Sequence, residues 1–343
     1  MPRIRYVSPA VAAAIAVVAI GAGLTAGKSM FGGDAAASSG GPSAIAGTRI
    51  DVITKATDSE FWQSMLAGSK KAGGDLGVKL GLFGPTSETD IDGQVKLVEN
   101  SISRGADAIV LAANSSTALN GVVKRARSHG IKVITVDNAI TTKSAGFIGT
   151  DNIKAGQQAG ERLCQLMKGK GHGDGKVIHE SSVSGQQVLV DRFTGFKEGL
   201  AKGCPDADIV QTLVNDNDIN KAVSQVGDVL SSRKDIVGIF ADNNVSGTGV
   251  ARAIKEKKAA KRVAAVAFDS DPAEVDAVRN GTLSAIVVQN PFFFGYQGVV
   301  EAGMAVRGST PPVNLDPGAV VIDKSMVDEP EYRQLVNPPK TKG

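Results

Sequence analysis

Residues 108–138, AIVLAANSSTALNGVVKRARSHGIKVITVDN, decide the fold of this chain. The run opens with an apolar segment over 108–112 that has the length of a buried strand, and a second strand is expected over 132–136. Between them, the spacing of apolar residues predicts a helix over 117–129 that ends near Gly130. A strand, a helix and a strand in this order predict two parallel strands joined by a right-handed crossover.

The same alternation continues in both directions along the chain. Further strands are expected over residues 49–53, 78–83, 176–179, 209–214, 237–241 and 263–268. Helices are expected between them, over residues 61–72, 92–102, 155–167, 188–200, 219–230 and 247–257. The alternation starts afresh after Gly149-Thr150-Asp151-Asn152. The sequence therefore predicts an α/β protein with two Rossmann-like lobes, each a parallel sheet flanked by helices.

The two halves of the chain repeat one pattern, in which polar residues follow apolar strands. In the first half these residues are Asn114 and Asp137, and in the second half they are Asn243 and Asp269. The carboxyl ends of parallel strands form the ligand crevice of open α/β sheets. If the two lobes face each other, we expect these four side chains to surround one cleft, although each alone could be a helix cap or turn residue.

Two aromatic residues, Phe61 and Trp62, stand at the start of the first expected helix. Consecutive helix residues point about 100° apart, so at least one of the two rings can face the cleft. Carboxylates and amides exchange hydrogen bonds with hydroxyl groups, and an aromatic face packs on the C–H side of a sugar ring. This set of side chains is suited to a neutral polyol.

The composition of the 343-residue chain excludes several classes of protein. With 42% hydrophobic and 21% charged residues, the chain is typical of soluble globular proteins and unlike a disordered one. A net charge of +3 without a long basic run gives no support for a nucleic-acid partner. Two cysteines and three histidines are too few for a disulfide scaffold or a His-rich metal centre. We expect neither a metal nor another cofactor.

The common motifs of catalysis are not found in the sequence. It contains no Gly-x-Ser-x-Gly elbow, no phosphate-binding loop and no dinucleotide fingerprint after the first strand. The expected cleft residues include no nucleophile paired with a base. We therefore expect a binding protein rather than an enzyme.

The first residues of the chain are typical of a targeting segment. Arg3 and Arg5 precede an apolar run over 10–27, as in a secretory signal, although about 18 residues is also the lower limit for a membrane span. We expect residues 1–37 to be a signal peptide or an N-terminal membrane anchor, and residues 38–47 to be a flexible Ser/Gly-rich linker. In either case the body is exported, and an uncleaved leader would be its contact with the membrane.

The two cysteines lie forty residues apart in the second lobe, Cys164 on one expected helix and Cys204 at the end of another. In an exported protein they could form one disulfide. Two free, buried thiols are the alternative, because sequence spacing does not settle the geometry of a pair.

Several short motifs together carry a resemblance to a known family. They are Glu60-Phe61-Trp62, Ile134-Thr135-Val136-Asp137, Gly149-Thr150-Asp151-Asn152, Asp191-Arg192-Phe193-Thr194-Gly195-Phe196, Phe240-Ala241-Asp242-Asn243, Ala267-Phe268-Asp269 and Val288-Gln289-Asn290-Pro291. The order and spacing of these motifs match that family. From about Thr48 onward, the chain resembles the ribose-binding branch of the type I periplasmic binding proteins.

The resemblance implies a function and a set of partners. Two lobes joined by a multi-strand hinge would close on a sugar or polyol and hand it to the permease of an ABC importer, which works with its ATPase. The protein would be a periplasmic or otherwise extracytoplasmic monomer.

The resemblance also implies roles for individual residues. Asp137, Asn243 and Asp269 would bind ligand hydroxyls, as would Gln289 from a hinge segment. Arg192 would contact ring or hydroxyl oxygens, and Phe61 or Trp62 would stack on the ring. The complete expected site is Lys55, Ser59, Phe61, Trp62, Asn114, Asp137, Asn138, Arg192, Asn217, Asn243, Asp269 and Gln289.

Three of these positions depart from the ribose binders. Lys55 stands where the ribose binders have a small polar residue, and Asn138 stands where they have an arginine. Asn217 is the position nearest to the one where they have an aromatic residue in the second lobe. The ligand therefore need not be ribose. Lys55 and the stretch Gly84-Pro85-Thr86 are similar to the receptor for autoinducer-2. A sensory receptor for a sugar or an autoinducer-2-like signal, without transport, is the alternative function.

The same comparison suggests where the lobes begin and end. The N-terminal lobe is expected over residues 48–150 plus about 290–317, and the C-terminal lobe over 151–289 plus about 318–343. The chain would then cross between the lobes near Asp151, near Gln289 and around residues 316–318.

Overall fold

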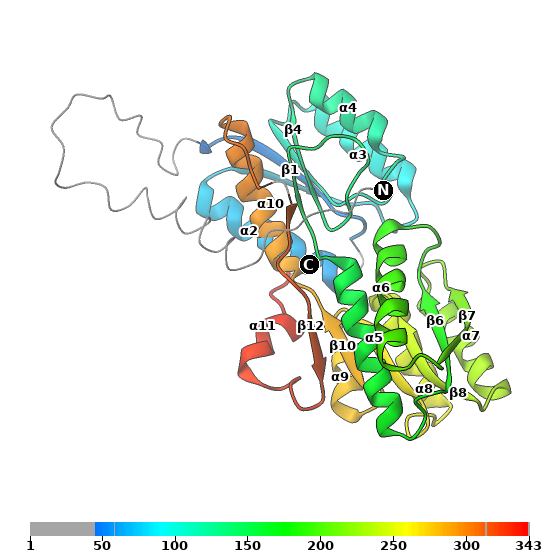
Figure 1. Cartoon of the computed structure of the whole chain (residues 1–343). Helices are drawn as coiled ribbons and strands as arrows, with labels where there is room; N and C mark the ends of the chain where they lie inside the picture. Colours follow the sequence, from blue (N-terminus) through cyan, green and yellow to red (C-terminus); the bar gives the residue numbers. More distant parts are fainter. Residues whose placement is uncertain (1–44, 58, 313, 342–343) are drawn as a thin grey trace.

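The computed structural model describes residues 45–57, 59–312 and 314–341, which form the two lobes seen one above the other in Figure 1. The expected leader and most of the expected linker lie outside these residues. Residues 45–47, at the end of that linker, are docked on the N-terminal lobe, where Ile45 is buried and Gly47 N donates to Gly77 O. Within the described ranges, no helix combines the length and the hydropathy that a membrane span needs.

The N-terminal lobe is built on a six-stranded sheet in the order β11-β5-β4-β3-β1-β2, and every neighbouring pair is parallel. Its strands are β1 (Arg49–Ile53), β2 (Lys79–Phe83), β3 (Ala108–Leu111), β4 (Lys132–Val136), β5 (Gly146–Ile148) and β11 (Asn314–Leu315). Strand β3 is fully buried, because it lies inside the sheet with helices on both sides.

Helices cover both faces of this sheet. They are α2 (Glu60–Leu76), α3 (Ile91–Ser103), α4 (Asn120–Ser128) and α10 (Pro291–Val306). Alternate residues of β3 point to opposite faces. Val110 therefore packs in the cluster that contains residues of α2 and α10, and Ile109 packs with residues of α3 and α4.

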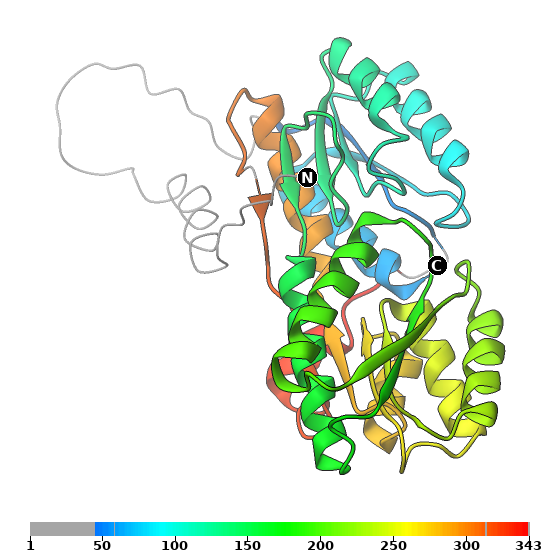
Figure 2. The ribbon, with the colours of Figure 1, turned by 45° about the vertical axis from the view of Figure 1, so that its right-hand side comes forward.

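The C-terminal lobe repeats this architecture with the order β12-β10-β9-β8-β6-β7. Its strands are β6 (Lys176–Ser181), β7 (Asp208–Val214), β8 (Ile236–Ala241), β9 (Ala264–Phe268), β10 (Ala285–Val288) and β12 (Val320–Asp323). The helices are α5 (Asn152–Gly169), α6 (Gln187–Gly203), α7 (Ile219–Ser232), α8 (Asn244–Glu256) and α9 (Pro272–Asn280), followed by the 3-10 turn η2 (Pro330–Tyr332) and α11 (Arg333–Val336). Figure 2 shows helices on both faces of this sheet as well.

The expected fold class is confirmed, with one difference at an edge. Strand β12 pairs antiparallel with β10, whereas the sequence predicted a purely parallel sheet. The chain reaches β12 directly from β11 of the other lobe, so it enters the sheet without the helical crossover that parallel pairing requires.

The chain passes between the two sheets at three points: from β5 to α5, from β10 to α10, and from β11 to β12. Thr150 on the first crossing donates a hydrogen bond to Gln289 on the second, at 2.9 Å. These crossings lie next to the expected boundaries near residues 150, 290 and 317. The limits of the two lobes as folding units stay a prediction.

Helices α5 and α6 lie so close together that glycine is required at their contact. A Cβ atom on Gly195 would stand 1.9 Å from Ile153 O, and one on Gly156 would stand 2.1 Å from Arg192 O. Cys164 in α5 and Cys204, the residue that follows α6, are joined as a disulfide with their Cα atoms 5.7 Å apart. This tight helix pair carries Arg192, so its packing fixes the position of a candidate site residue.

We expect Gly195→Ala to destabilise the protein by about 1–3 kcal/mol, because the added methyl group forces α5 and α6 apart. Gly74→Ala is the matched control, since Gly74 lies exposed in α2 and an added Cβ would meet nothing within 4 Å. That change should stabilise by about 0.5–1 kcal/mol through helix propensity. Urea unfolding measures both, and equal effects of the two substitutions would contradict the close-packing argument.

Candidate ligand-binding cleft

Two aspartates occupy matching positions at the facing edges of the two sheets. Asp137 follows β4 and Asp269 follows β9, and both have left-handed backbone, with φ of 61° and 80°. The Asp137 N–H donates to Ile148 O at 2.8 Å, and the Asp269 N–H donates to Val287 O at 2.9 Å. Left-handed backbone in a residue other than glycine is uncommon and concentrates at functional sites. The shared geometry therefore singles out these two carboxylates.

A cavity between the lobes brings together eight of the residues expected from the sequence. They are Lys55, Phe61, Trp62 and Asp137 from the N-terminal lobe, and Arg192, Asn243, Asp269 and Gln289 from the other side. Five further residues, which sequence reasoning did not identify, also line the cavity: Glu88, Gln186, Val188, Leu189 and Asn244.

The N-terminal wall of the cavity is organised by a buried ion pair. Lys55 Nζ lies 2.6 Å from Asp137 Oδ2, and these two side chains are only 3% and 5% exposed. The Lys55 ammonium also lies 5.7 Å from the centre of the Trp62 ring. Trp62 Nε1 donates to Glu88 at 2.9 Å, and its ring meets the Phe61 ring edge-on at 4.8 Å. Both aromatic residues thus face the cavity with fixed orientations.

Arg192 is the fixed cation of the C-terminal wall. Its Nε donates to Asn152 at 2.8 Å, and its Nη1 donates to the backbone oxygen of Asp242 at 2.8 Å. The guanidinium lies 4.2 Å from the centre of the Phe268 ring, and the residue is 3% exposed. These contacts hold the guanidinium in place before any ligand arrives.

Asp269 is the acidic counterpart on the same wall. It accepts hydrogen bonds from Gln289 Nε2 at 2.7 Å and from the backbone N–H of Asn244 at 3.1 Å. Burial raises the pKa of Asp269 to about 6, and the Arg192 charge and the Gln289 hydrogen bond oppose this rise. Gln289 also accepts from Thr150, so Asp269 is connected to two of the three crossings between the lobes.

Two expected residues lie beneath the cavity rather than on its surface. Asn114 Nδ2 donates to the backbone oxygen of Lys55 at 3.2 Å, and Asn138 Nδ2 donates to the backbone oxygen of Ala113 at 2.9 Å. Each asparagine thereby ties neighbouring strand ends together, which supports the wall that carries Lys55 and Asp137.

Two other expected residues line an outer groove between the lobes. Ser59 caps the N-terminus of α2, and Asn217 has left-handed backbone, with φ of 63°. Asn243 does reach the cavity, but it also caps α8, because its side chain accepts from Ser246 N at 2.9 Å. The groove is lined by Ser59, Glu60, Glu88, Asn217, Asp218, Ile219, Asn220, Asn244, Val245, Arg252 and Asp271.

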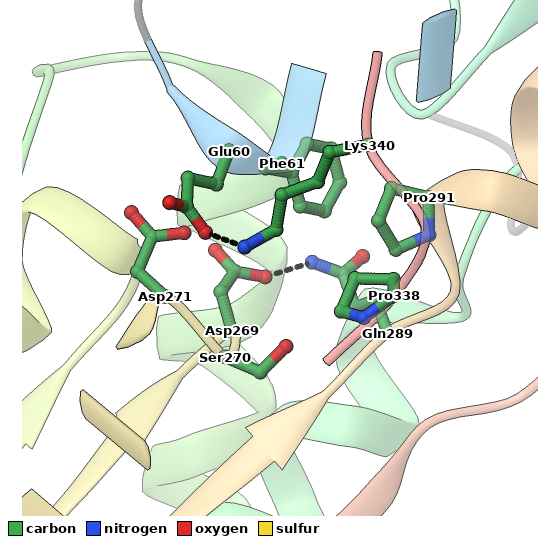
Figure 3. A pocket seen from close by; sticks show the side chains of 9 residues that line it. All are labelled: Glu60, Phe61, Asp269, Ser270, Asp271, Gln289, Pro291, Pro338 and Lys340. Carbon is green, nitrogen blue, oxygen red and sulfur yellow. Dashed lines mark hydrogen bonds and ion pairs between the residues drawn. The ribbon is translucent and has the colours of Figure 1, made fainter. Parts of the chain in front are cut away.

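A second, smaller pocket adjoins the cavity and shares Phe61, Asp269 and Gln289 with it (Figure 3). Its remaining lining consists of Glu60, Ser270, Asp271, Pro291, Pro338 and Lys340. Pro338 and Lys340 come from the C-terminal tail, which was not among the expected site residues.

The cavity is suited to binding an uncharged polar molecule. Its ionisable lining consists of two basic and three acidic side chains, so no strong charge of either sign is left for an ionic ligand. Hydrogen-bond donors and acceptors stand on both walls, and aromatic rings stand on one. Within the described ranges, no group of His, Cys, Asp or Glu side chains is placed to hold a metal ion.

Comparisons with known proteins agree with this architecture. The family model of the periplasmic binding protein domain matches residues 50–310. A ribose import binding protein of Haemophilus influenzae is 30% identical over 271 residues, which cover 78% of this chain and 88% of that protein.

Solved structures give the same result. A carbohydrate transporter solute-binding protein of Agrobacterium radiobacter, in complex with D-arabinose, is 32% identical with a TM-score of 0.82, covering 85% of this chain and 100% of that one. An ABC transporter solute-binding protein of Agrobacterium vitis with bound D-fucose is 31% identical with a TM-score of 0.80, covering 84% and 99%.

The chain belongs to the periplasmic binding protein family. This membership confirms the family expected from the motifs, and it confirms that the protein is a binding protein and not an enzyme.

We expect Asp137→Asn to destabilise the protein by about 3 kcal/mol at neutral pH, because Lys55 would be left buried without its counter-charge. Adding Lys55→Met removes the stranded charge and should recover more than half of the loss. Urea unfolding of both variants measures this. A double variant as unstable as Asp137→Asn alone would show that the buried charge is not the cause.

Proposed function

We propose that this protein is the extracytoplasmic substrate-binding protein of an ABC importer, and that its cleft binds a neutral monosaccharide or related polyol. The observation that carries the proposal is the cavity shared by both lobes, in which Asp137 and Asp269 occupy matching positions on opposite walls. The proposal is supported by the relatives, since those described above are named for ribose or were solved with D-arabinose or D-fucose.

In this proposal each wall contributes its own hydrogen bonds. Asp137 and Lys55 bind hydroxyl groups from the N-terminal lobe, and Asp269, Asn243 and Arg192 bind them from the C-terminal lobe. Phe61 or Trp62 packs on the ring, and Gln289 orients Asp269. Asn114 and Asn138 act by bracing the strand ends, and Ser59 and Asn217 act at the rim of the cleft.

Closure of the lobes about their three crossings completes the site and expels water. A ligand that lacks one hydroxyl then leaves a buried polar group without a partner, which costs binding free energy and gives selectivity. The closed protein, acting as a monomer, would be recognised by the permease that works with the ATPase. The leader would direct export as a cleaved signal peptide or hold the protein at the membrane.

Titration calorimetry against neutral pentoses, hexoses and polyols tests the proposal. We expect one site per chain, and a ligand at 100 times its Kd should add about 2.7 kcal/mol to the free energy of unfolding. Arg192→Gln should weaken binding at least tenfold, because the substitution removes a charged donor. Arg127→Gln, on the exposed end of α4, is the matched control and should leave affinity unchanged. A folded protein that binds none of these compounds would exclude the proposal.

The pKa of Asp269 predicts how affinity depends on pH. A carboxylate accepts hydroxyl hydrogen bonds, and protonation of the free protein competes with that role. With a raised pKa of about 6, affinity should stay level above pH 7 and fall about tenfold between pH 7 and pH 5. Asp269→Asn should bind more weakly at pH 7 and lose this pH dependence. An unchanged slope in that variant would assign the titration to another group.

A further inference from the structure

The C-terminal tail, residues 337–341, leaves the C-terminal lobe after α11. Val336 of α11 is buried in the core of that lobe, and Tyr332 and Leu335 pack against the same cluster. Ser270 Oγ donates to the backbone oxygen of Leu335 at 2.9 Å, directly beside Asp269. The chain is therefore anchored to the C-terminal lobe up to residue 336.

A few residues later the chain is bound to the other lobe. Lys340 forms an ion pair with Glu60, and the N–H of Thr341 donates to Gln63 O at 3.4 Å. Thr341 Oγ also donates to the side-chain oxygen of Gln63. Glu60 and Gln63 belong to the first turn of α2 in the N-terminal lobe. The tail thus spans the cleft and makes contacts with both lobes.

The tail also forms a wall of the cleft. Pro338 and Lys340 line the small pocket that shares Phe61, Asp269 and Gln289 with the ligand cavity (Figure 3). Two consecutive prolines, Pro338 and Pro339, restrict the backbone between the two anchors, so the tail is a semi-rigid strap rather than a loose end.

The charges around Lys340 explain why a cation stands at this point. Figure 3 shows its ammonium directed at Glu60, with the carboxyl groups of Asp269 and Asp271 facing the same space. Glu60 comes from one lobe and the two aspartates from the other, so closure brings like charges together. An ammonium group among them offsets that repulsion in the closed form.

We propose that residues 338–341 are a latch that holds the lobes closed and slows the release of ligand. The latch rests on the proposed function, since it acts on the closure that traps a ligand in the cleft. Its contacts with Glu60 and Gln63 must break before the lobes can separate, whereas the hinge crossings stay intact. The latch therefore opposes opening and leaves the chemistry of ligand recognition to the cavity.

The test uses the full chain and follows Trp62, the single tryptophan, which lines the cavity. Stopped-flow fluorescence measures release of the monosaccharide that binds best in calorimetry. Lys340→Ala should speed release about two- to fivefold, the range expected for a partly exposed ion pair. Lys340→Arg should restore slow release, and Lys324→Ala, an exposed lysine on the turn after β12, should not change it.

Salt gives a second arm of the same experiment. High salt should speed release from the unchanged protein toward the rate of Lys340→Ala, because a partly exposed ion pair is screened. The same salt should have little effect on that variant. If sugar binds and Lys340→Ala releases it at the unchanged rate, the latch is wrong.

A measurement without ligand separates failure of the latch from failure of the proposed function. Small-angle X-ray scattering of the ligand-free chain should give a larger radius of gyration for Lys340→Ala than for the unchanged protein and for Lys324→Ala. If no sugar binds but this difference is found, the latch stands and the ligand assignment fails. If no sugar binds and the three radii agree, the latch is overturned as well.

Discussion

Parallel pairing brings the carboxyl ends of all strands in a sheet to one edge, and the cleft exists because two such edges face each other. The constraint acts in both lobes, since Asp137 and Asp269 directly follow strands at these edges and both have left-handed backbone. Such backbone costs of order 1 kcal/mol per residue and persists only where the surroundings hold it. Here the N–H groups of Asp137 and Asp269 are bonded to the next strand, which turns both carboxylates toward the same cavity.

The charged groups of the cavity are held in place by the protein itself. Lys55 is paired with Asp137, and Arg192 is bonded to Asn152 and to the backbone of Asp242. Burial of such groups without partners would be costly, so these bonds are needed for the fold as well as for the site. Groups that are already oriented lose little further freedom when a ligand binds, which favours affinity. The close packing of α5 on α6 therefore contributes to recognition through the position of Arg192.

Much of this architecture could be predicted from the sequence, because buried parallel strands read as continuous apolar runs. The residues over 108–112 and 132–136 predicted β3 and β4. The polar residues after the strands predicted that Asp137 and Asp269 would lie at the cleft. Strand β5 has only three residues, and β12 pairs through an antiparallel contact that no local pattern encodes. Elements of that kind are set by tertiary structure.

The site could be predicted only in part. Glu88 and Gln186 line the cavity from loops that follow β2 and β6, and the rule that selected Asp137 could have found them, since those strands end at the same edges. Asn138 follows Asp137 in sequence, yet its side chain turns to Ala113, because the left-handed residue before it changes the direction of the chain. The contact of Lys340 with Glu60 joins residues 280 positions apart, and sequence periodicity carries no information about it.

A crystal structure grown with the tightest-binding monosaccharide would show whether the sugar is enclosed between the two lobes. We expect one sugar in the cavity, with hydroxyl groups bonded to Asp137 on one wall and to Asp269 and Arg192 on the other. A sugar bound on the outer surface, or held by residues of a single lobe, would rule out this mode of binding.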